Sequence, residues 1–308
     1  MIRQTLFRLS QQPGLRDVAT GNPIARKMAS RFVAGETLDE ALAAVRRINR
    51  RGMSATLDYL GENVRSDAEA LESIEVTCAI LRALAAAEVD CNVSLKLTQL
   101  GLDISEEFAG GSMEQVLDVA ASLNTFVRVD MEGSEYTQRT LDLFLQLFVR
   151  YPNTGTVIQS YLYRSQADVE RLIEAGARMR LVKGAYLEPP TVAFSRKEEV
   201  DANFVRLMEM LLTGGNYPAI ATHDPAMIEA TKQFAQRHQI GAEAFEFQML
   251  YGIRRDLQTQ LVAEGYRVRI YVPFGTQWYP YLMRRMAERP ANVMFVLTNL
   301  AREAGSRR

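Results

Sequence analysis

Short apolar segments and amphipathic segments alternate eight times along this chain, and this alternation constrains the fold more than any other feature. The apolar segments are rich in β-branched and aromatic residues, as buried strands are. The expected strands are Met53–Leu60, Cys91–Leu100, Thr125–Met131, Thr156–Leu162, Met179–Tyr186, Pro218–His223, Ala244–Leu250 and Arg267–Phe274. Strands that alternate with helices predict parallel βαβ units.

The segments between the strands have helical spacing. Leu141, Phe144, Leu145 and Phe148, for example, fall on one face of a helix. The sequence Asp224-Pro225 is a typical helix start, and Ser66 or Asp67 is a suitable N-cap. The expected helices are Asp67–Glu88, Ser112–Leu123, Gln138–Arg150, Gln166–Ala175, Glu198–Leu212, Pro225–Arg237, Arg254–Glu264 and Tyr281–Glu288, with the weakest signal in Ser112–Leu123.

Eight parallel units are the number that closes a barrel. The alternative, an open doubly wound sheet, usually starts with a glycine-rich phosphate loop, and neither G-x-G-x-x-G nor G-x-x-x-x-G-K-[ST] occurs in this sequence. We therefore expect an α/β fold, a TIM-like (β/α)8 barrel. Residues 1–50 are expected to form an N-terminal helical arm, clearest at Leu38–Ile48, and residues 51–308 the catalytic barrel.

Composition excludes several classes of function. The chain has 36 Lys and Arg against 37 Asp and Glu, spread along its length, so no nucleic-acid-binding surface is expected. Two cysteines are too few for a metal cluster and are typical of a reducing compartment. With His223 and His238 the only histidines, a His-based metal site is not expected. Without a signal-peptide-like or membrane-spanning apolar run, the sequence indicates a cytoplasmic protein, or one peripheral to a membrane.

Polar side chains recur toward the carboxyl ends of consecutive expected strands, where barrel enzymes carry their active sites. They are Lys96, Asp130, Gln159, Arg180 with Lys183, and His223. A charged residue in an apolar strand is costly unless it is paired or faces a ligand. The pattern fits either ion pairing inside the barrel, for example Lys96 with Asp130, or a ligand site.

A second polar pattern follows the eighth expected strand. Tyr281, Arg284, Arg285 and Glu288 fall on one helical face. Two neighbouring guanidinium groups suit bidentate binding of a small carboxylate, and a solvated helix with a Glu–Arg pair explains the same spacing equally well. From these residues alone, we expect a barrel enzyme that binds a small anionic substrate, and its basic groups suit a phosphate as well.

Taken in order, these residues resemble the proline dehydrogenase family in its monofunctional bacterial form. The resemblance covers about residues 50–295, and its most specific parts are Arg180-Leu-Val-Lys-Gly-Ala-Tyr186 and Tyr281-x-x-Arg-Arg-x-x-Glu288. The other matching pieces are Leu60–Glu62, Ser94–Leu97, Val129–Glu132, Ala221–His223, Phe245–Gly252 and Tyr271–Gly275.

The resemblance implies a distorted (β/α)8 barrel that holds FAD non-covalently at the carboxyl ends of its strands, without a Rossmann loop. It implies oxidation of L-proline to 1-pyrroline-5-carboxylate by hydride transfer to flavin N5, the first step of proline catabolism to glutamate. A membrane quinone would then reoxidise the flavin, which suits a location at the inner face of the cell membrane. A 1-pyrroline-5-carboxylate dehydrogenase is one candidate partner, and no metal is implied.

The resemblance also implies roles for individual residues. Arg284, Arg285 and Lys96 would hold the proline carboxylate, with Glu62 pairing with Arg284 as a gate. The residues at the reaction centre would be Arg180, beside flavin N5, and Asp130, which orders the basic groups. Tyr271 and Tyr281 would wall the proline ring. The FAD contacts would be Met131, Gln159, Lys183, Gly184, Ala185, Thr222 and His223.

Two other functions fit parts of the pattern. A Schiff-base aldolase would use Lys96 or Lys183 as its nucleophile, but it leaves the other cations without a role. A flavin-binding or ligand-binding protein without turnover would not need the full set of substrate-binding positions. A yellow colour of the purified protein distinguishes a flavoprotein from the aldolase, and bleaching of that colour by L-proline distinguishes an enzyme from a binding protein.

Overall fold

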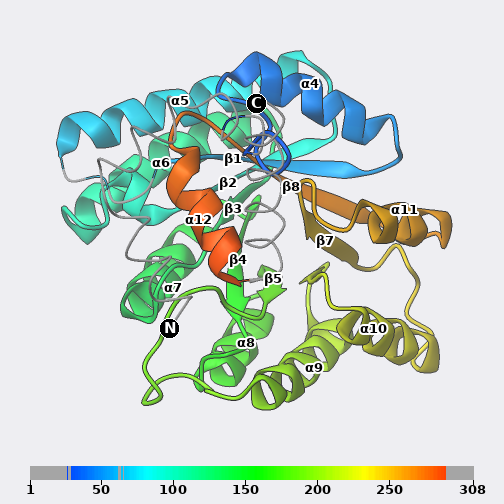
Figure 1. Ribbon diagram of the computed structural model, residues 1–308. Helices are drawn as coiled ribbons and strands as arrows, with labels where there is room; N and C mark the ends of the chain where they lie inside the picture. The colour runs from blue at the N-terminus through cyan, green and yellow to red at the C-terminus, as the bar shows by residue number, and fades with distance from the viewer. Residues whose placement is uncertain (1–25, 27–28, 62–63, 65, 289–308) are drawn as a thin grey trace, which may run out of the picture.

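The computed structural model is a closed barrel of parallel strands in the order β1 to β8, and it describes residues 26, 29–61, 64 and 66–288 (Figure 1). Every strand pairs in parallel with its sequence neighbours, and β1 pairs with β8 to close the barrel. The strands are β1 Ser54–Tyr59, β2 Cys91–Leu95, β3 Val127–Val129, β4 Thr154–Gln159, β5 Arg178–Val182, β6 Ala219–Ala221, β7 Glu246–Leu250 and β8 Val268–Phe274. The eight expected strands and the TIM-like barrel are confirmed.

Several strand ends were predicted too late: the fourth strand ends at Gln159 rather than at Leu162, and the fifth at Val182 rather than at Tyr186. The second strand ends at Leu95 rather than at Leu100, because Leu97–Leu100 form a 3-10 helix, η1. Gly101 follows with a φ of 91°, a left-handed conformation that glycine adopts readily. The apolar side chains of η1 are buried as strand residues would be, so hydrophobicity alone does not distinguish the two structures.

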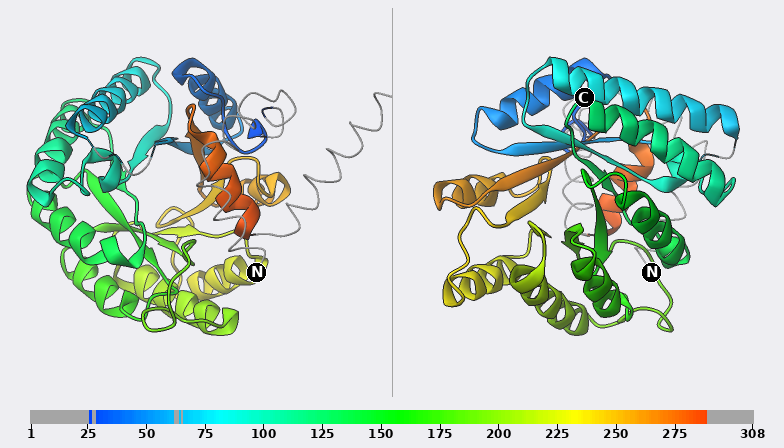
Figure 2. Two further views of the ribbon diagram at one scale, coloured as in Figure 1. Left: turned by 60° about the vertical axis from the view of Figure 1, so that its left-hand side comes forward. Right: turned by 180° about the vertical axis from the view of Figure 1, so that it is seen from behind.

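The helices surround the barrel, as the turned view in Figure 2 shows. Their bounds are α4 Leu38–Asn49, α5 Asp67–Ala86, α6 Glu106–Ser122, α7 Ser134–Phe148, α8 Ser165–Glu174, α9 Lys197–Gly214, α10 Pro225–Arg237, α11 Arg255–Ala263 and α12 Trp278–Glu288. Ser66 caps α5 and Asp224 caps α10. The weakest expected helix, α6, begins earlier than predicted, because Ser105 caps it and Gly110 and Gly111 are accommodated inside it.

Helix α4 packs against β1 and β8, and its apolar residues Ala41, Val45 and Ile48 join the main core of the barrel. The rest of the expected N-terminal arm lies mostly outside the described residues. The division into an arm of residues 1–50 and a barrel of residues 51–308 stays a prediction. No helix in the described part of the chain is long and apolar enough to cross a membrane.

The two faces of the strands differ in polarity, which decides where chemistry is possible. One set of alternate residues packs against the helices in the main core, for example Leu57, Val93 and Phe247. The other set is polar and makes contacts across the barrel, for example between Arg180 and Asp130. The interior of this barrel is therefore a network of charged and amide side chains rather than layers of aliphatic residues.

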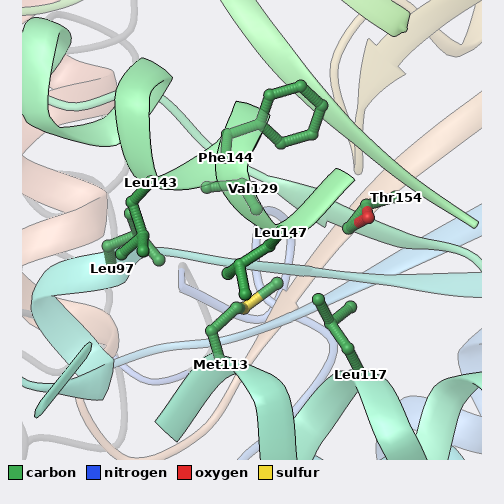
Figure 3. Close-up of a pocket in the computed structure, with 8 residues that line it drawn as sticks. All are labelled: Leu97, Met113, Leu117, Val129, Leu143, Phe144, Leu147 and Thr154. Atoms are coloured by element: carbon green, nitrogen blue, oxygen red, sulfur yellow. The ribbon is translucent and has the colours of Figure 1, made fainter. Parts of the chain in front are cut away.

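A small hollow lies outside the strands, between β3, β4 and the helices α6 and α7 (Figure 3). Thr154 supplies the one polar side chain among its lining residues Leu97, Met113, Leu117, Val129, Leu143, Phe144, Leu147 and Thr154. A lining without a titratable group offers no catalytic chemistry. The hollow belongs to the packing between barrel and helices.

Candidate active site

Asp130 is the centre of the polar cluster inside the barrel. It follows β3, and its carboxylate accepts from Nη1 of Arg180 at 2.6 Å and from the Ser94 hydroxyl at 3.1 Å through one oxygen. The other oxygen accepts from the Tyr271 hydroxyl at 2.7 Å. Side chains from β2, β3, β5 and β8 thus converge on a single buried carboxylate. The structure brings together three of the predicted site residues, Asp130, Arg180 and Tyr271.

Lys96 completes this cluster from the end of β2. Its Nζ lies 3.2 Å from Oδ1 of Asp58 and 3.9 Å from Oδ2 of Asp130. The predicted pairing of Lys96 with Asp130 is present, but Asp58 is the nearer partner, and sequence reasoning missed it. The sequence signal for Asp58 was a carboxylate inside the apolar strand segment Ala55–Leu60. In the structure Asp58 is 1% exposed.

Tyr271 has a defined protonation state and orientation. The guanidinium of Arg180 lies 5.1 Å from its ring centroid. Loss of hydration inside the barrel, and then the negative charge of Asp130, raise the pKa of Tyr271 well above its ordinary value. The phenol is therefore neutral at physiological pH and acts as the hydrogen-bond donor to Asp130. This hydrogen bond fixes the ring of Tyr271, which lies in the middle of β8.

Arg180 has a third partner that sequence reasoning also missed. Its Nε donates to Oε1 of Gln248 on β7, and Gln248 in turn contacts Glu246. Gln248 and Glu246 are each 3% exposed. They lie within the motif Phe245–Gly252 quoted above, but nothing in their spacing indicates which strand they face.

Gln159 ends β4 with an unusual hydrogen-bond balance. Its Nε2 donates to the backbone oxygen of Glu132 at 3.1 Å, while its buried Oε1 accepts no hydrogen bond within the described part of the protein. A buried acceptor without a donor costs free energy comparable to a lost hydrogen bond. Such an atom suits a ligand that brings an N–H or O–H group.

Lys183, at the end of β5, is bound by acidic residues. Its Nζ lies 2.5 Å from Asp201 on α9 and 2.7 Å from Asp224, which caps α10. Burial would raise the pKa of Asp224, but the hydrogen bond from Lys183 and neighbouring groups hold it below its ordinary value. The ammonium therefore links two helices to the strand end through these two carboxylates.

The segment after β5 passes close to the end of β4. Gly184 has a φ of +112°, and a Cβ at this position would lie 2.5 Å from the ring of Tyr161. Only glycine fits both the conformation and the space. Ala185 beside it is half-buried, and Met131 after β3 is buried.

Thr222 and His223 directly follow β6, and their side chains accept hydrogen bonds from nearby backbone N–H groups. The Thr222 hydroxyl accepts from the backbone N–H of Asp224 at 3.1 Å. Nε2 of His223 accepts from the backbone N–H of Leu250 at 2.9 Å, so this nitrogen carries no proton. His223 thus joins the ends of β6 and β7.

Helix α12 crosses the barrel end in front of the strands in Figure 1. Its apolar residues pack with Phe32, Val33 and Leu60 in a second core cluster, which places it at the carboxyl end of β1. Tyr281 is buried, and the guanidinium of Arg285 lies 5.3 Å from its ring. Glu62 and the side chain of Arg284 lie outside the described residues, and with them the predicted gate.

The sequence of this chain is similar to those of known proteins. The family model described as proline dehydrogenase matches residues 41–298. Proline dehydrogenase 1 of Bacillus subtilis subsp. natto is 44% identical over 303 residues, covering 98% of this chain and all of that protein. Proline dehydrogenase of Deinococcus radiodurans is 40% identical over 305 residues, covering 97% of this chain and 98% of that protein.

A solved structure is similar in fold. The proline utilization A (PutA) protein from Bdellovibrio bacteriovorus, inactivated by N-propargylglycine, has a TM-score of 0.80 and 30% sequence identity. The match covers 85% of this chain but 32% of that protein, so the chain corresponds to about a third of that longer polypeptide.

Proposed function

This chain belongs to the proline dehydrogenase family and oxidises proline to 1-pyrroline-5-carboxylate, and we propose that it does so with a non-covalently bound FAD whose electrons pass to a membrane quinone. The observation that carries the proposal is the convergence of Lys96, Asp130, Arg180 and Tyr271 at one end of the barrel. This is the end at which a (β/α)8 enzyme binds its ligands.

Charge balance supports the substrate assignment. Inside the barrel, Lys96 and Arg180 face Asp58 and Asp130, so two cations meet two carboxylates. Among these four groups, Lys96 and Arg180 are balanced by the two carboxylates and leave no net positive charge for the carboxylate of proline. We assign that charge to Arg284 and Arg285 of α12, with Lys96 as the third contact. Guanidinium groups bind carboxylates bidentately and fix their orientation.

The ring of the substrate needs an apolar enclosure, which aromatic side chains supply. We assign the two walls to Tyr271 and Tyr281, which come from β8 and α12. The hydrogen bond from Tyr271 to Asp130 holds one wall in place. Glu62 would pair with Arg284 and close the site over bound proline.

The residues at the ends of β4, β5 and β6 fit a flavin cofactor. When bound, FAD supplies the two-electron acceptor. The buried Oε1 of Gln159 is an acceptor that suits an N–H donor such as the flavin ring carries. Gly184 lets the segment after β5 pass close to the ring of Tyr161, because it has no side chain. The proposed FAD contacts are Met131, Gln159, Lys183, Gly184, Ala185, Thr222 and His223.

Arg180 would lie beside flavin N5, where a fixed positive charge raises the electron affinity of the ring. Asp130 keeps this guanidinium in place, since the two side chains form a 2.6 Å ion pair. The aldolase alternative loses support here. Lys96 and Lys183 each contact carboxylates, rather than lying in the apolar pocket that activates a Schiff-base lysine.

The test is an absorbance spectrum of the purified protein supplied with FAD. We expect L-proline to bleach the flavin band without oxygen, a quinone analogue to restore it, and NAD+ to be neither required nor reduced. N-propargylglycine should inactivate the enzyme, and proline should protect it. A protein that stays colourless and inert after addition of FAD contradicts the proposal. Contact with the inner face of the cell membrane, and with 1-pyrroline-5-carboxylate dehydrogenase, belongs to the same proposal.

A further inference from the structure

We propose that Gln248, held by Glu246, is a positioning residue that fixes the guanidinium of Arg180 for electron transfer in proline oxidation. The inference rests on the proposed function, since it concerns the residue assigned to the flavin. Neither Gln248 nor Glu246 is expected to touch the substrate or the cofactor.

The contacts of Arg180 define the plane of its guanidinium. Nη1 donates to Asp130 at 2.6 Å, Nη2 donates to Ser94 at 3.2 Å, and Nε donates to Gln248 at 2.5 Å. The partners come from three different strands, β3, β2 and β7. Because the guanidinium is rigid and planar, donors fixed on three sides leave it one orientation. Gln248 holds the side of the group nearest the Arg180 backbone.

The amide of Gln248 can face Arg180 in only one way. Its Nε2 donates to Oε1 of Glu246 at 2.5 Å. An ionised carboxylate only accepts hydrogen bonds, so the NH2 group must face Glu246 and the carbonyl oxygen must face Arg180. Glu246 thus sets the orientation of Gln248, although Glu246 does not itself contact Arg180.

Glu246 is anchored in turn by Arg269 on β8. Nε of Arg269 lies 2.9 and 3.2 Å from the two carboxylate oxygens, and its Nη1 donates to the backbone oxygen of Ala55 at 2.8 Å. Burial would raise the pKa of Glu246, but the charge of Arg269 and these hydrogen bonds hold it below its ordinary value. Glu246 is therefore ionised, and its carboxylate accepts the hydrogen bond from the amide of Gln248.

The decisive experiment compares Gln248→Met with the unmodified enzyme. Methionine is similar in length, but its thioether sulfur is a much weaker acceptor for the Nε hydrogen bond than the amide oxygen. We expect kcat to fall at least about tenfold, while KM for proline changes less than about threefold. We also expect the two-electron potential of bound FAD to fall by about 30 mV, since this corresponds to a tenfold change in the redox equilibrium.

A merely structural role would lower Tm without changing the flavin potential. Thr154→Val is the matched control, because Thr154 is also buried and its hydroxyl donates to the backbone oxygen of Tyr151 at 2.6 Å. It lies at the amino end of β4, far from the cluster around Asp130. We expect this variant to have a lower Tm and an unchanged potential and kcat.

Gln248→Glu tests the same contact by a second route. The new carboxylate keeps an acceptor toward Arg180 but faces the carboxylate of Glu246, and this like charge raises the pKa of the pair, which then binds a proton more readily. The charged or titratable groups around Glu246 are Arg128, Arg178, Tyr217, Arg267 and Arg269. The proton bound by the pair is lost as pH rises. We therefore expect potential and kcat to fall more steeply with pH than in the unmodified enzyme.

The outcomes separate this inference from the proposed function. A flavin potential and kcat unchanged in Gln248→Met, or an unaltered pH profile in Gln248→Glu, would overturn the role of Gln248 while proline still bleaches the unmodified enzyme. Failure of proline to bleach the unmodified enzyme would overturn the proposed function, and this inference with it. If Gln248→Met does not fold, the pH profile of Gln248→Glu decides.

Discussion

Arg180 and Asp130 lie 50 positions apart in the chain and form a 2.6 Å ion pair inside the barrel. Both side chains are almost fully buried. A buried pair of this kind contributes little net stability, but removal of one partner leaves the other charge uncompensated. The main effect of the pair is therefore to hold the guanidinium of Arg180 in position, and it adds little to the stability of the fold.

Asp130→Asn tests this pair. The variant keeps the shape of the side chain but leaves Arg180 without its counter-charge, so we expect the free energy of unfolding to fall by about 3 kcal/mol. We expect kcat to fall at least about tenfold, since the guanidinium is no longer held. Urea unfolding and proline kinetics measure the two effects. Asp168→Asn on α8, which breaks a partly exposed pair with Arg164, is the control and should change kcat little.

Arg285→Met tests the proposed carboxylate contact. A charge-assisted hydrogen bond contributes roughly 1.5–3 kcal/mol. We therefore expect KM for proline to rise at least about tenfold, because about 1.4 kcal/mol corresponds to a factor of ten. The protein should remain folded and yellow. Arg171→Met, on the exposed face of α8, should leave KM unchanged, and equal kinetics in both variants would contradict the assignment.

Tyr271 should decide the choice between proline and its hydroxylated form. Its ring is fixed by the hydrogen bond to Asp130, so a hydroxyl on the substrate ring meets a crowded wall. Crowding or burying an unpaired hydroxyl costs on the order of 1–3 kcal/mol. We expect kcat/KM for trans-4-hydroxy-L-proline to be lower than that for L-proline by roughly tenfold or more. Tyr271→Ser should narrow the gap, mainly by loss of proline activity, and equal use of both substrates by the unmodified enzyme contradicts this role.

Lys183→Met should destabilise the protein in a pH-dependent way. Burial would raise the pKa values of Asp201 and Asp224, but Lys183 and nearby groups hold both below their ordinary value. A carboxylate with a lowered pKa stabilises the fold above about pH 4, and this stability is lost as pH falls through the folded-state pKa. We expect a loss of about 1–2 kcal/mol at pH 7 and a smaller loss at pH 3. Urea unfolding at both pH values measures the loss of unfolding free energy. An equal loss at pH 7 and pH 3 contradicts this prediction.

Gly184→Ala should weaken both the fold and the binding of FAD. The new Cβ would lie 2.5 Å from the ring of Tyr161, in a left-handed conformation with a φ of +112°. We expect a loss of more than about 1 kcal/mol in the free energy of unfolding. Gly176→Ala is a matched control, because its φ is +74° but nothing lies within 4 Å of the added Cβ. Titration with FAD should show weaker binding in Gly184→Ala alone.

The sequence by itself determined the barrel and the identity of most cluster residues. The strand segments, the caps at Ser66 and Asp224, and the polar residues at strand ends depend on short-range patterns. These patterns carry physical signals within a few residues, such as a helix cap or a charged group in an apolar strand. A buried apolar run led to the wrong end of β2 at η1, and the glycines Gly110 and Gly111 led to the late start predicted for α6.

Only the tertiary structure decided which side chains meet across the barrel. Asp58 on β1 binds Lys96 at the end of the neighbouring strand β2, and Gln248 contacts Arg180 over 68 positions of sequence. A strand reveals which of its residues share a face, because successive side chains alternate. It does not reveal which residue of a distant strand lies opposite, since strand tilt and register set that relation only when the barrel closes.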